Sequence, residues 1–288
     1  MDSYQDKLKN SLAHLPEGST PVRARLEQIW ADMRVPLLEI LPEPPGLPED
    51  ADAYLADVDE VYKTDSYHSL SIEGFRVTPE LIERVCGGDW DPENREEDRK
   101  NRDALAARGY WQAFQKVRES LGSIFAGEPA GTVPRNGFRS WYREMFQPFA
   151  QAGKFDAAAL AGFRTSQVFI SGSRHVPPEW RQVAGAMEGL FSLLEHEEHA
   201  GVRATLGHWA VGFIHPYLDG NGRMARFLMN AMLASGGYPW TVIKVEDRQA
   251  YMAALEVASV DRDIRPFGEF LAARIRAAMP PEGGPAPS

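Results

Sequence analysis

The side chains with the most chemistry lie in one short stretch, residues 213–226, which reads Phe-Ile-His-Pro-Tyr-Leu-Asp-Gly-Asn-Gly-Arg-Met-Ala-Arg. His215 is a candidate general base because an imidazole titrates near neutral pH. Asp219 offers the hard oxygen ligand that Mg²⁺ prefers, and Mg²⁺ in turn favours phosphate co-ligands. A base and a metal ligand four residues apart predict chemistry on a phosphorylated substrate.

The glycines and arginines of the same stretch predict an anion site. Gly220, Asn221 and Gly222 form a turn at the start of a helix, where backbone N–H groups and the helix dipole attract negative charge. Arg223 and Arg226 are three residues apart, so they lie on nearly the same face of the first turn and can bind phosphate oxygens. Each residue alone has an ordinary explanation as part of a helix end or a turn. Together they predict phosphoryl or nucleotidyl transfer.

The elements that must position this stretch are mostly helices. One helix is expected to end at His215, because a residue before proline is biased out of the α region, and another to start near Gly222. Residues 164–171 carry β-branched and aromatic residues between glycines, which predicts a strand or hairpin arm. Other helical patterns cover residues 23–40, 51–67, 79–85, 95–120, 138–150, 156–162, 180–199, 203–214, 222–235 and 247–260. The fold class predicted is mainly α.

Composition and charge exclude several classes of protein. The chain has 288 residues, 43% of them hydrophobic, which is enough to bury a core in one large or two modest domains. Its net charge of -10 repels phosphate backbones, so no nucleic-acid partner is expected. Apolar runs are too short for a membrane span, and the first residues lack the apolar region of a secretory signal. With one cysteine, Cys86, no intrachain disulfide can form, and a cytoplasmic location is expected.

The stretch HPYLDGNGRMAR, residues 215–226, resembles the Fic-domain signature, His-x-Phe-x-Asp/Glu-Gly-Asn-Gly-Arg-x-x-Arg, with Tyr217 in place of the usual phenylalanine. The resemblance implies a Fic-type helical bundle that transfers AMP from ATP to a Ser, Thr or Tyr hydroxyl of a protein target or of itself. His215 would deprotonate the hydroxyl, and Asp219 would hold Mg²⁺ or Mn²⁺. Residues 220–222 would cradle the phosphates, and the two arginines would neutralise pyrophosphate. The intact Gly-Asn-Gly favours nucleotidyl transfer over the Doc-type kinase branch.

Two further segments fit the same resemblance. Residues 164–171, followed by residues 175–178, resemble the family's flap, a β-hairpin over the site whose exposed edge can pair with an extended target. An ordinary edge hairpin is the alternative. Tyr251 lies where the family often places an aromatic residue against the nucleotide base. The flap residues expected to dock a target are Gln167, Val168, Phe169, Ile170 and Ser171.

A second motif, Ser-Leu-Ser-Ile-Glu-Gly over residues 69–74, matches the family's inhibitory pattern, Ser/Thr-x-x-x-Glu-Gly/Asn. Ser69 and Glu73 are four residues apart, on one face of a helix, with Gly74 as a natural helix stop. By resemblance, Glu73 pairs with Arg226 and tilts ATP away from in-line geometry. The alternative is an ordinary surface glutamate at a helix end.

The chain is expected to divide into an N-terminal helical regulatory region over residues 1–125, a Fic catalytic core over 126–278 and a disordered tail over 279–288. The predicted function is an autoinhibited protein adenylyltransferase. One alternative is an enzyme that removes AMP, or that transfers UMP or another phosphate-linked group. Another is a module that binds nucleotide or a partner without chemistry. The sequence is compatible with a homodimer and does not show one.

Overall fold

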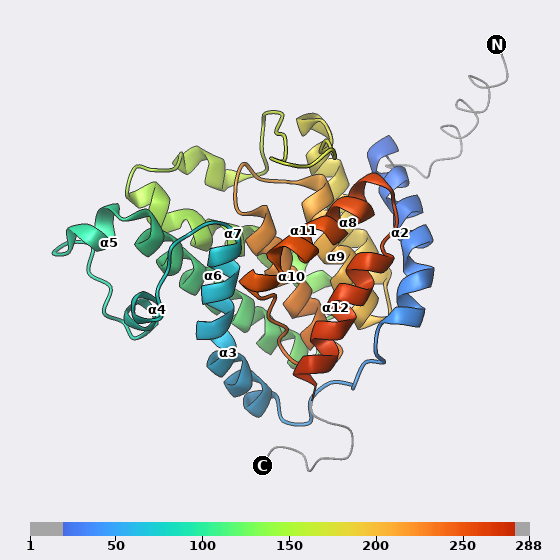
Figure 1. The fold of residues 1–288 in the computed structure, drawn as a ribbon, viewed down its shortest axis with the longest axis horizontal. Coiled ribbons are helices and arrows are strands. Elements are labelled where there is room, and N and C mark those ends of the chain that lie inside the picture. The colour runs from blue at the N-terminus through green and yellow to red at the C-terminus, as the bar shows by residue number, and fades with distance from the viewer. Residues whose placement is uncertain (1–19, 280–288) are drawn as a thin grey trace.

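The computed structural model describes residues 20–279, and within this range it contains helices and loops without a β-strand (Figure 1). The predicted mainly α class is therefore confirmed. The start of the predicted regulatory region, residues 1–19, and nearly all of the predicted tail lie outside the described residues. The α-helices are α2 (Pro21–Ile40), α3 (Ala51–Ile72), α4 (Pro79–Cys86), α5 (Glu96–Lys100), α6 (Arg102–Phe125), α7 (Thr132–Gln151), α8 (Val183–His196), α9 (Ala200–Ile214), α10 (Asn221–Ala234), α11 (Arg248–Val260) and α12 (Arg265–Ala278).

Short 3₁₀ helices complete the fold: η1 (Ala157–Ala161), η2 (Trp180–Gln182) and η3 (Val245–Asp247). No helix in the described range is long and apolar enough to cross a membrane.

Helices α9 and α10 pack against each other at the centre of the molecule. Every residue from Arg223 to Ala234 in α10 is buried, as expected for a helix that other helices surround. α3, α6 and α7 contact α10, while α2, α8, α11 and α12 contact α9. The stretch predicted to carry the chemistry links these two central helices. The core therefore fixes both of its ends.

The N-terminal helices share one hydrophobic core with the rest of the described chain. The cluster of buried apolar side chains runs without interruption from Leu26 in α2 to Ile275 in α12. Phe114 of α6 connects the two parts, because its ring contacts Tyr62 of α3 and Trp240 near the C-terminal helices. In Figure 1, α2 lies on the opposite side of the molecule from α4 and α5. A regulatory boundary at residue 125 stays a prediction.

The segment carrying the inhibitory motif ends a helix, as predicted. Glu73 is the C-cap of α3, and Gly74 follows with φ of 81°, the left-handed conformation that glycine adopts at low cost. The next helix, α4, has Thr78 as its N-cap and Pro79 as its first residue. The Thr78 hydroxyl oxygen accepts a hydrogen bond from the Leu81 N–H at 3.2 Å.

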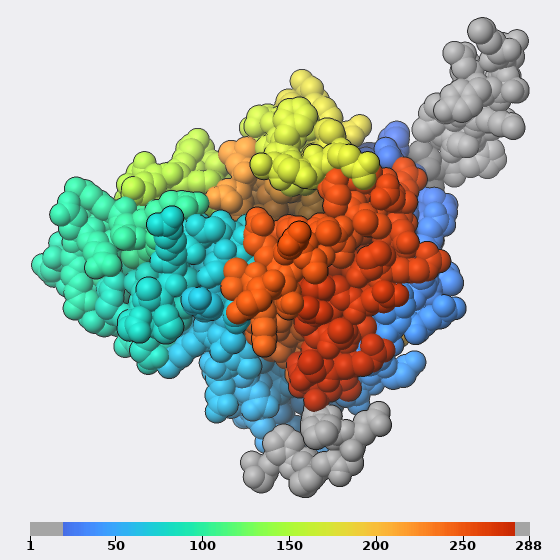
Figure 2. Space-filling model, viewed as in Figure 1, coloured from blue at the N-terminus to red at the C-terminus, as the bar shows by residue number. Residues whose placement is uncertain are grey.

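The β-hairpin predicted for the flap is wrong. Residues 164–178, here called the flap loop, turn back on themselves without forming strands. Side chains link the arms instead: the Gln167 amide donates to the Pro177 carbonyl at 3.1 Å, and the Arg164 guanidinium donates to the Pro178 carbonyl at 2.5 Å. A strand ladder is blocked because Pro177 and Pro178 have no N–H to donate. The flap loop (yellow-green in Figure 2) projects from the surface of the helical body.

Candidate active site

The catalytic loop, residues 215–220, connects α9 to α10. His215 adopts the left-handed conformation, with φ of 51° and ψ of 61°, and its N–H still donates to the Val211 carbonyl at 2.9 Å. The following Pro216 disfavours the α conformation at this position, so the helix ends here as predicted. A left-handed conformation is uncommon for a residue with a Cβ, and it is typical of functional sites.

The His215 imidazole lines a cavity of about 500 Å³ between the end of α3, the flap loop and α11. Its Nδ1 lies 3.4 Å from the Gly212 carbonyl, which favours a proton on Nδ1 and leaves Nε2 as the basic nitrogen. Burial lowers the pKa of His215, the Gly212 carbonyl opposes this shift, and the Arg164 guanidinium lowers the pKa further. The imidazole is therefore neutral near pH 7 and can accept a proton.

The side chain of Asn221 holds the catalytic loop in shape. Its Nδ2 donates to the Tyr217 carbonyl and its Oδ1 accepts from the Tyr217 N–H, both at 2.9 Å. The Tyr217 ring is buried and stacks on Tyr142 with ring centroids 3.5 Å apart. Tyrosine therefore anchors the loop on the helical core. The amide of Asn221 is used internally, which leaves its backbone N–H to bind a ligand.

The start of α10 offers a group of free backbone donors. The first hydrogen bond within the helix runs from the Met224 N–H to the Gly220 carbonyl at 3.0 Å. The N–H groups of residues 221–223 therefore have no partner inside the helix and point towards its positive end. A side chain at Gly220 would collide with the Phe146 ring, so only glycine fits this turn. We call residues 220–223 the anion nest.

Arg223 adds a full positive charge to the anion nest. Its side chain is buried, and none of its guanidinium nitrogens has a hydrogen-bond partner in the described part of the chain. The Asp219 carboxylate lies 3.6 Å away, and the rings of Phe75 and Phe146 lie 5.1 Å from the guanidinium carbon. A buried donor without an acceptor is costly. Arg223 is therefore positioned to bind an anion whose oxygen atoms accept its hydrogen bonds.

Asp219 fits a metal ion that arrives with a nucleotide. Its side chain is 58% exposed, and its Oδ1 accepts from the Gly220 N–H at 2.6 Å. Within residues 20–279, no group of three or more His, Cys, Asp or Glu side chains is arranged to hold a metal. Mg²⁺ needs no such group, because it is commonly bound by one or two carboxylates together with substrate phosphates and water. The donor set present is thus the one expected for a nucleotide-bound Mg²⁺.

Glu73 and Arg226 form the contact that the inhibitory motif predicts. Glu73 Oε1 accepts from the Arg226 guanidinium at 2.8 Å, and Arg226 also donates to the Ser69 hydroxyl at 2.8 Å and the Ser69 carbonyl at 3.0 Å. Burial alone would raise the pKa of Glu73, but Arg226 and Arg223 outweigh it and hold that pKa below its usual value. A side chain at Gly222 would collide with the Glu73 carboxylate, so this glycine allows the approach.

Tyr251 lines the cavity, but its hydroxyl is already engaged. The Tyr251 hydroxyl and His208 Nε2 lie 2.7 Å apart, and both side chains are buried. Burial raises the pKa of Tyr251 to about 12, so the hydroxyl stays protonated. Contact between the Tyr251 ring and a nucleotide base stays a prediction.

The flap residues predicted to dock a target lie partly over the cavity and partly in solvent. Ile170 and Ser171 line the cavity, while Phe169 is 76% exposed. Gln167 is exposed, and Val168 is half-buried.

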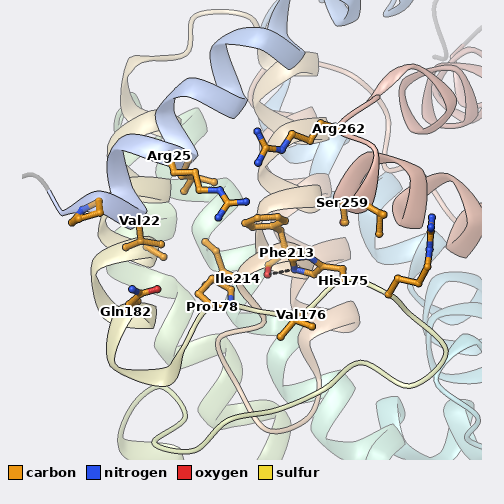
Figure 3. Close-up of a pocket in the computed structure, with 15 residues that line it drawn as sticks. Val22, Arg25, His175, Val176, Pro178, Gln182, Phe213, Ile214, Ser259 and Arg262 are labelled. Carbon is orange, nitrogen blue, oxygen red and sulfur yellow. Dashed lines mark hydrogen bonds between the residues drawn. The ribbon is translucent and has the colours of Figure 1, made fainter. Parts of the chain in front are cut away.

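Two contacts that were not predicted from the sequence hold the flap loop down. The Glu256 carboxylate of α11 accepts from the Ser173 hydroxyl and from the Arg174 N–H. His175 Nε2 lies 2.8 Å from the Phe213 carbonyl, and its ring stacks on the Phe213 ring (Figure 3). Figure 3 views this contact from a second cavity, of about 490 Å³, on the α2 side of His175.

Arg164 is the site residue that sequence reasoning missed. It is buried, its Nε donates to the His215 carbonyl at 2.8 Å, and its backbone N–H donates to the Pro216 carbonyl at 2.9 Å. The sequence separates Arg164 from His215 by 51 positions. No local pattern distinguishes an arginine that will be buried from one that stays in solvent.

A neutral imidazole, one exposed carboxylate and an anion nest lie together on the link between two central helices, an arrangement that can bind a phosphorylated ligand and accept a proton beside it. Residues 133–233 match the family model described as Fic/DOC family. Over 124 residues, or 42% of its length, the chain is 38% identical to the protein adenylyltransferase Fic of Drosophila grimshawi and to that of Aedes aegypti. The match covers 25% and 24% of those proteins, so the chain spans about a quarter of the length of these curated relatives.

Solved structures show the same fold. Fic-1 from C. elegans is 21% identical, with a TM-score of 0.62, and the match covers 89% of this chain and 70% of that one. A structure of IbpAFic2 covalently tethered to Cdc42 is 15% identical, with a TM-score of 0.54, and the match covers 93% of this chain and 81% of that one. At these identities the likeness supports the fold alone.

Proposed function

We propose that the protein is an adenylyltransferase that transfers AMP from ATP to a hydroxyl group of a protein. The observation that carries this proposal is the neutral His215 on the same short loop as an anion nest whose buried Arg223 guanidinium has no hydrogen-bond partner among the described residues. Curated proteins with similar sequences over the Fic domain are named protein adenylyltransferases, which supports the same reaction.

The reaction needs the phosphates to be held while a hydroxyl attacks. The N–H groups of residues 221–223 and the Arg223 guanidinium would bind phosphate oxygens, and Asp219 would hold Mg²⁺ or Mn²⁺. Such a metal, when bound, neutralises negative charge that builds up on the phosphates. His215 Nε2 would accept the proton of the target hydroxyl. The hydroxyl oxygen then bonds to the α-phosphorus, the bond from that phosphorus to the bridging oxygen breaks, and pyrophosphate leaves.

Glu73 would keep this site inactive in the state described here. Arg226 is the second arginine of the signature, and two of its guanidinium nitrogens donate to Ser69 and Glu73, which leaves fewer donors for a phosphate. The Glu73 carboxylate stays ionised because its pKa is lowered. A negative charge beside the anion nest repels a triphosphate and removes one of the groups that would bind it.

The flap loop would supply the docking edge for a protein target. Phe169 is exposed at its outer arm, and Ile170 and Ser171 reach the cavity. An extended target segment could pair with the open backbone of this arm and bring its hydroxyl to His215. Curated proteins similar over the Fic domain are named protein adenylyltransferases, which supports a protein as the substrate.

Labelling with two forms of ATP tests the proposed function. Glu73→Gly protein, incubated with Mg²⁺, is expected to incorporate label from ATP labelled at the α-phosphate and none from ATP labelled at the γ-phosphate. His215→Ala in the same background is the control and is expected to stay unlabelled. Incorporation of the γ-label would instead identify a kinase.

Intact-mass measurement separates the remaining alternatives. The Glu73→Gly protein is incubated with ATP, UTP, GTP and CTP in turn, and the mass gained identifies the group transferred. A gain of one adenylyl group supports the proposal. A uridylyl gain would change the donor, and release of AMP from a modified protein would reverse the direction. Nucleotide binding without any mass change would leave a non-catalytic module.

A further inference from the structure

The C-terminal end of α9 has carbonyl groups that the helix cannot satisfy. After a helix ends, its last carbonyls need outside donors, and here the chain continues with a left-handed residue and then Pro216, which has no N–H. The flap loop supplies the donors. The His175 ring bonds to the Phe213 carbonyl, as Figure 3 shows, and Arg164 binds the carbonyls of His215 and Pro216.

Arg164 makes more hydrogen bonds to backbone carbonyls than any other residue of the flap loop. Its Nε donates to the His215 carbonyl at 2.8 Å and one terminal nitrogen donates to the Ser166 carbonyl at 2.8 Å. The other terminal nitrogen donates to the Pro178 carbonyl at 2.5 Å. All three acceptors are backbone carbonyls, and the planar guanidinium fixes the angles between them. One buried side chain therefore joins both ends of the flap loop to the catalytic loop.

We propose that Arg164 is a positioning residue for the catalytic imidazole, holding His215 in its left-handed backbone conformation and in register with the flap loop. This inference rests on the proposed function. A left-handed conformation at a residue with a Cβ persists only where surrounding bonds enforce it. The carbonyl of His215 belongs to the same residue as the base, so loosening the bond from Arg164 shifts the imidazole. A displacement of that kind reduces turnover by about 100-fold.

Arg164 also acts on the charge of the base. Besides burial and the Gly212 carbonyl, three side chains affect the pKa of His215. Arg164 and His175, both from the flap loop, lower this pKa, and Glu73 at the end of α3 raises it. Removing the positive charge of Arg164 is therefore expected to raise the pKa of His215, while replacing Arg164 with lysine keeps a charge nearby and removes only the fork of donors.

Kinetics in the activated Glu73→Gly protein test the role of Arg164. Arg164→Gln is expected to lower kcat by about 100-fold with no change in KM for ATP, and to move the acid limb of the pH profile to higher pH. Arg164→Lys is expected to lower kcat with a smaller pH shift. The matched control is Arg181→Gln, because Arg181 is exposed and its side chain contacts Glu179 and the Trp180 ring, away from the catalytic loop. An Arg164→Gln protein with the kcat and pH profile of its parent would overturn the inference.

A titration that needs no activity gives an independent reading. The ring signal of His215 is identified by its loss in His215→Ala and followed by NMR against pH. Its pKa is expected to rise in Arg164→Gln, and an unchanged pKa together with an unchanged kcat refutes the positioning role. If Arg164→Gln does not fold, the kcat of Arg164→Lys tests the inference instead. A kcat equal to that of the Glu73→Gly parent would overturn the inference. An inactive Glu73→Gly parent would refute the proposed function. The NMR titration would still test whether Arg164 affects the pKa of His215.

Discussion

Replacing Glu73 with glycine removes the carboxylate that accepts a hydrogen bond from Arg226 at 2.8 Å, and we expect this change to activate the enzyme. Glycine suits the position, because Glu73 is the C-cap of α3 and makes no interior helical turn. The Arg226 donor that Glu73 occupies then becomes free for a phosphate of ATP. The space beside Gly222 opens as well, since the Glu73 carboxylate lies directly against it.

The size of the activation follows from this one contact. The Glu73 side chain is 23% exposed and that of Arg226 is 2% exposed, so water screens the pair weakly. A hydrogen bond to a charged group contributes about 1.5–3 kcal/mol. Since about 1.4 kcal/mol corresponds to a factor of ten, the wild type should be slower than Glu73→Gly by about 10- to 150-fold.

The assay is the initial rate of self-labelling with ATP labelled at the α-phosphate, in Mg²⁺. Glu73→Gln should fall between wild type and Glu73→Gly, because the amide keeps a contact with Arg226 and loses the charge. Glu60→Gln serves as the control, since Glu60 is an exposed glutamate of the same helix. Equal rates for wild type and Glu73→Gly, with both proteins folded, would refute the inhibitory role of this ion pair.

Four further changes have outcomes that the structure predicts. In Glu73→Gly, activity should fall only below pH 6.5, because burial lowers the pKa of His215 from its usual value of 6.5 and the neutral imidazole is the active form. A loss of activity that begins above pH 6.5 would contradict this prediction. His208, whose pKa burial lowers to about 3, binds a proton on unfolding, so the free energy of unfolding should drop as pH falls below 6.5. In urea titrations, His208→Gln should reduce the slope of the free energy of unfolding against pH by up to about 1.4 kcal/mol per pH unit. An unchanged slope would contradict the lowered pKa of His208. Arg223→Lys should weaken ATP binding by at least about tenfold in calorimetry, because lysine cannot offer the same fork, while the melting temperature without nucleotide stays the same. Asp219→Asn should abolish the stimulation of labelling by Mg²⁺, measured over a range of Mg²⁺ concentrations, and full stimulation in this variant would exclude Asp219 as the ligand.

The parts of the site that could be predicted from the sequence are local. His215, Asp219 and the anion nest lie within one helix–loop–helix link, where proline and glycine largely decide the backbone. The Glu73–Arg226 contact joins residues 153 positions apart, and only the resemblance to a known family pointed to it. The structure places the two side chains 2.8 Å apart.

The parts that were missed depend on tertiary packing. The flap segment carries strand-forming residues, but prolines in its second arm remove the donors that a hairpin needs. Arg164 belongs to the site because its side chain is buried and donates to carbonyls of the catalytic loop and the flap loop. Its neighbours along the chain do not indicate that it will be buried. The amide of Asn221 holds Tyr217 in place, a role that depends on the folded loop, and the prediction that Asn221 cradles phosphate stays a prediction that concerns its backbone N–H.

A crystal structure of Glu73→Gly with Mg²⁺ and a non-hydrolysable ATP analogue would test the central claim most directly. We expect phosphate oxygens on the N–H groups of residues 221–223 and on the Arg223 guanidinium, the metal on Asp219, and His215 Nε2 facing the α-phosphorus. A triphosphate bound away from the anion nest, or an imidazole turned out of the cavity, would contradict the account.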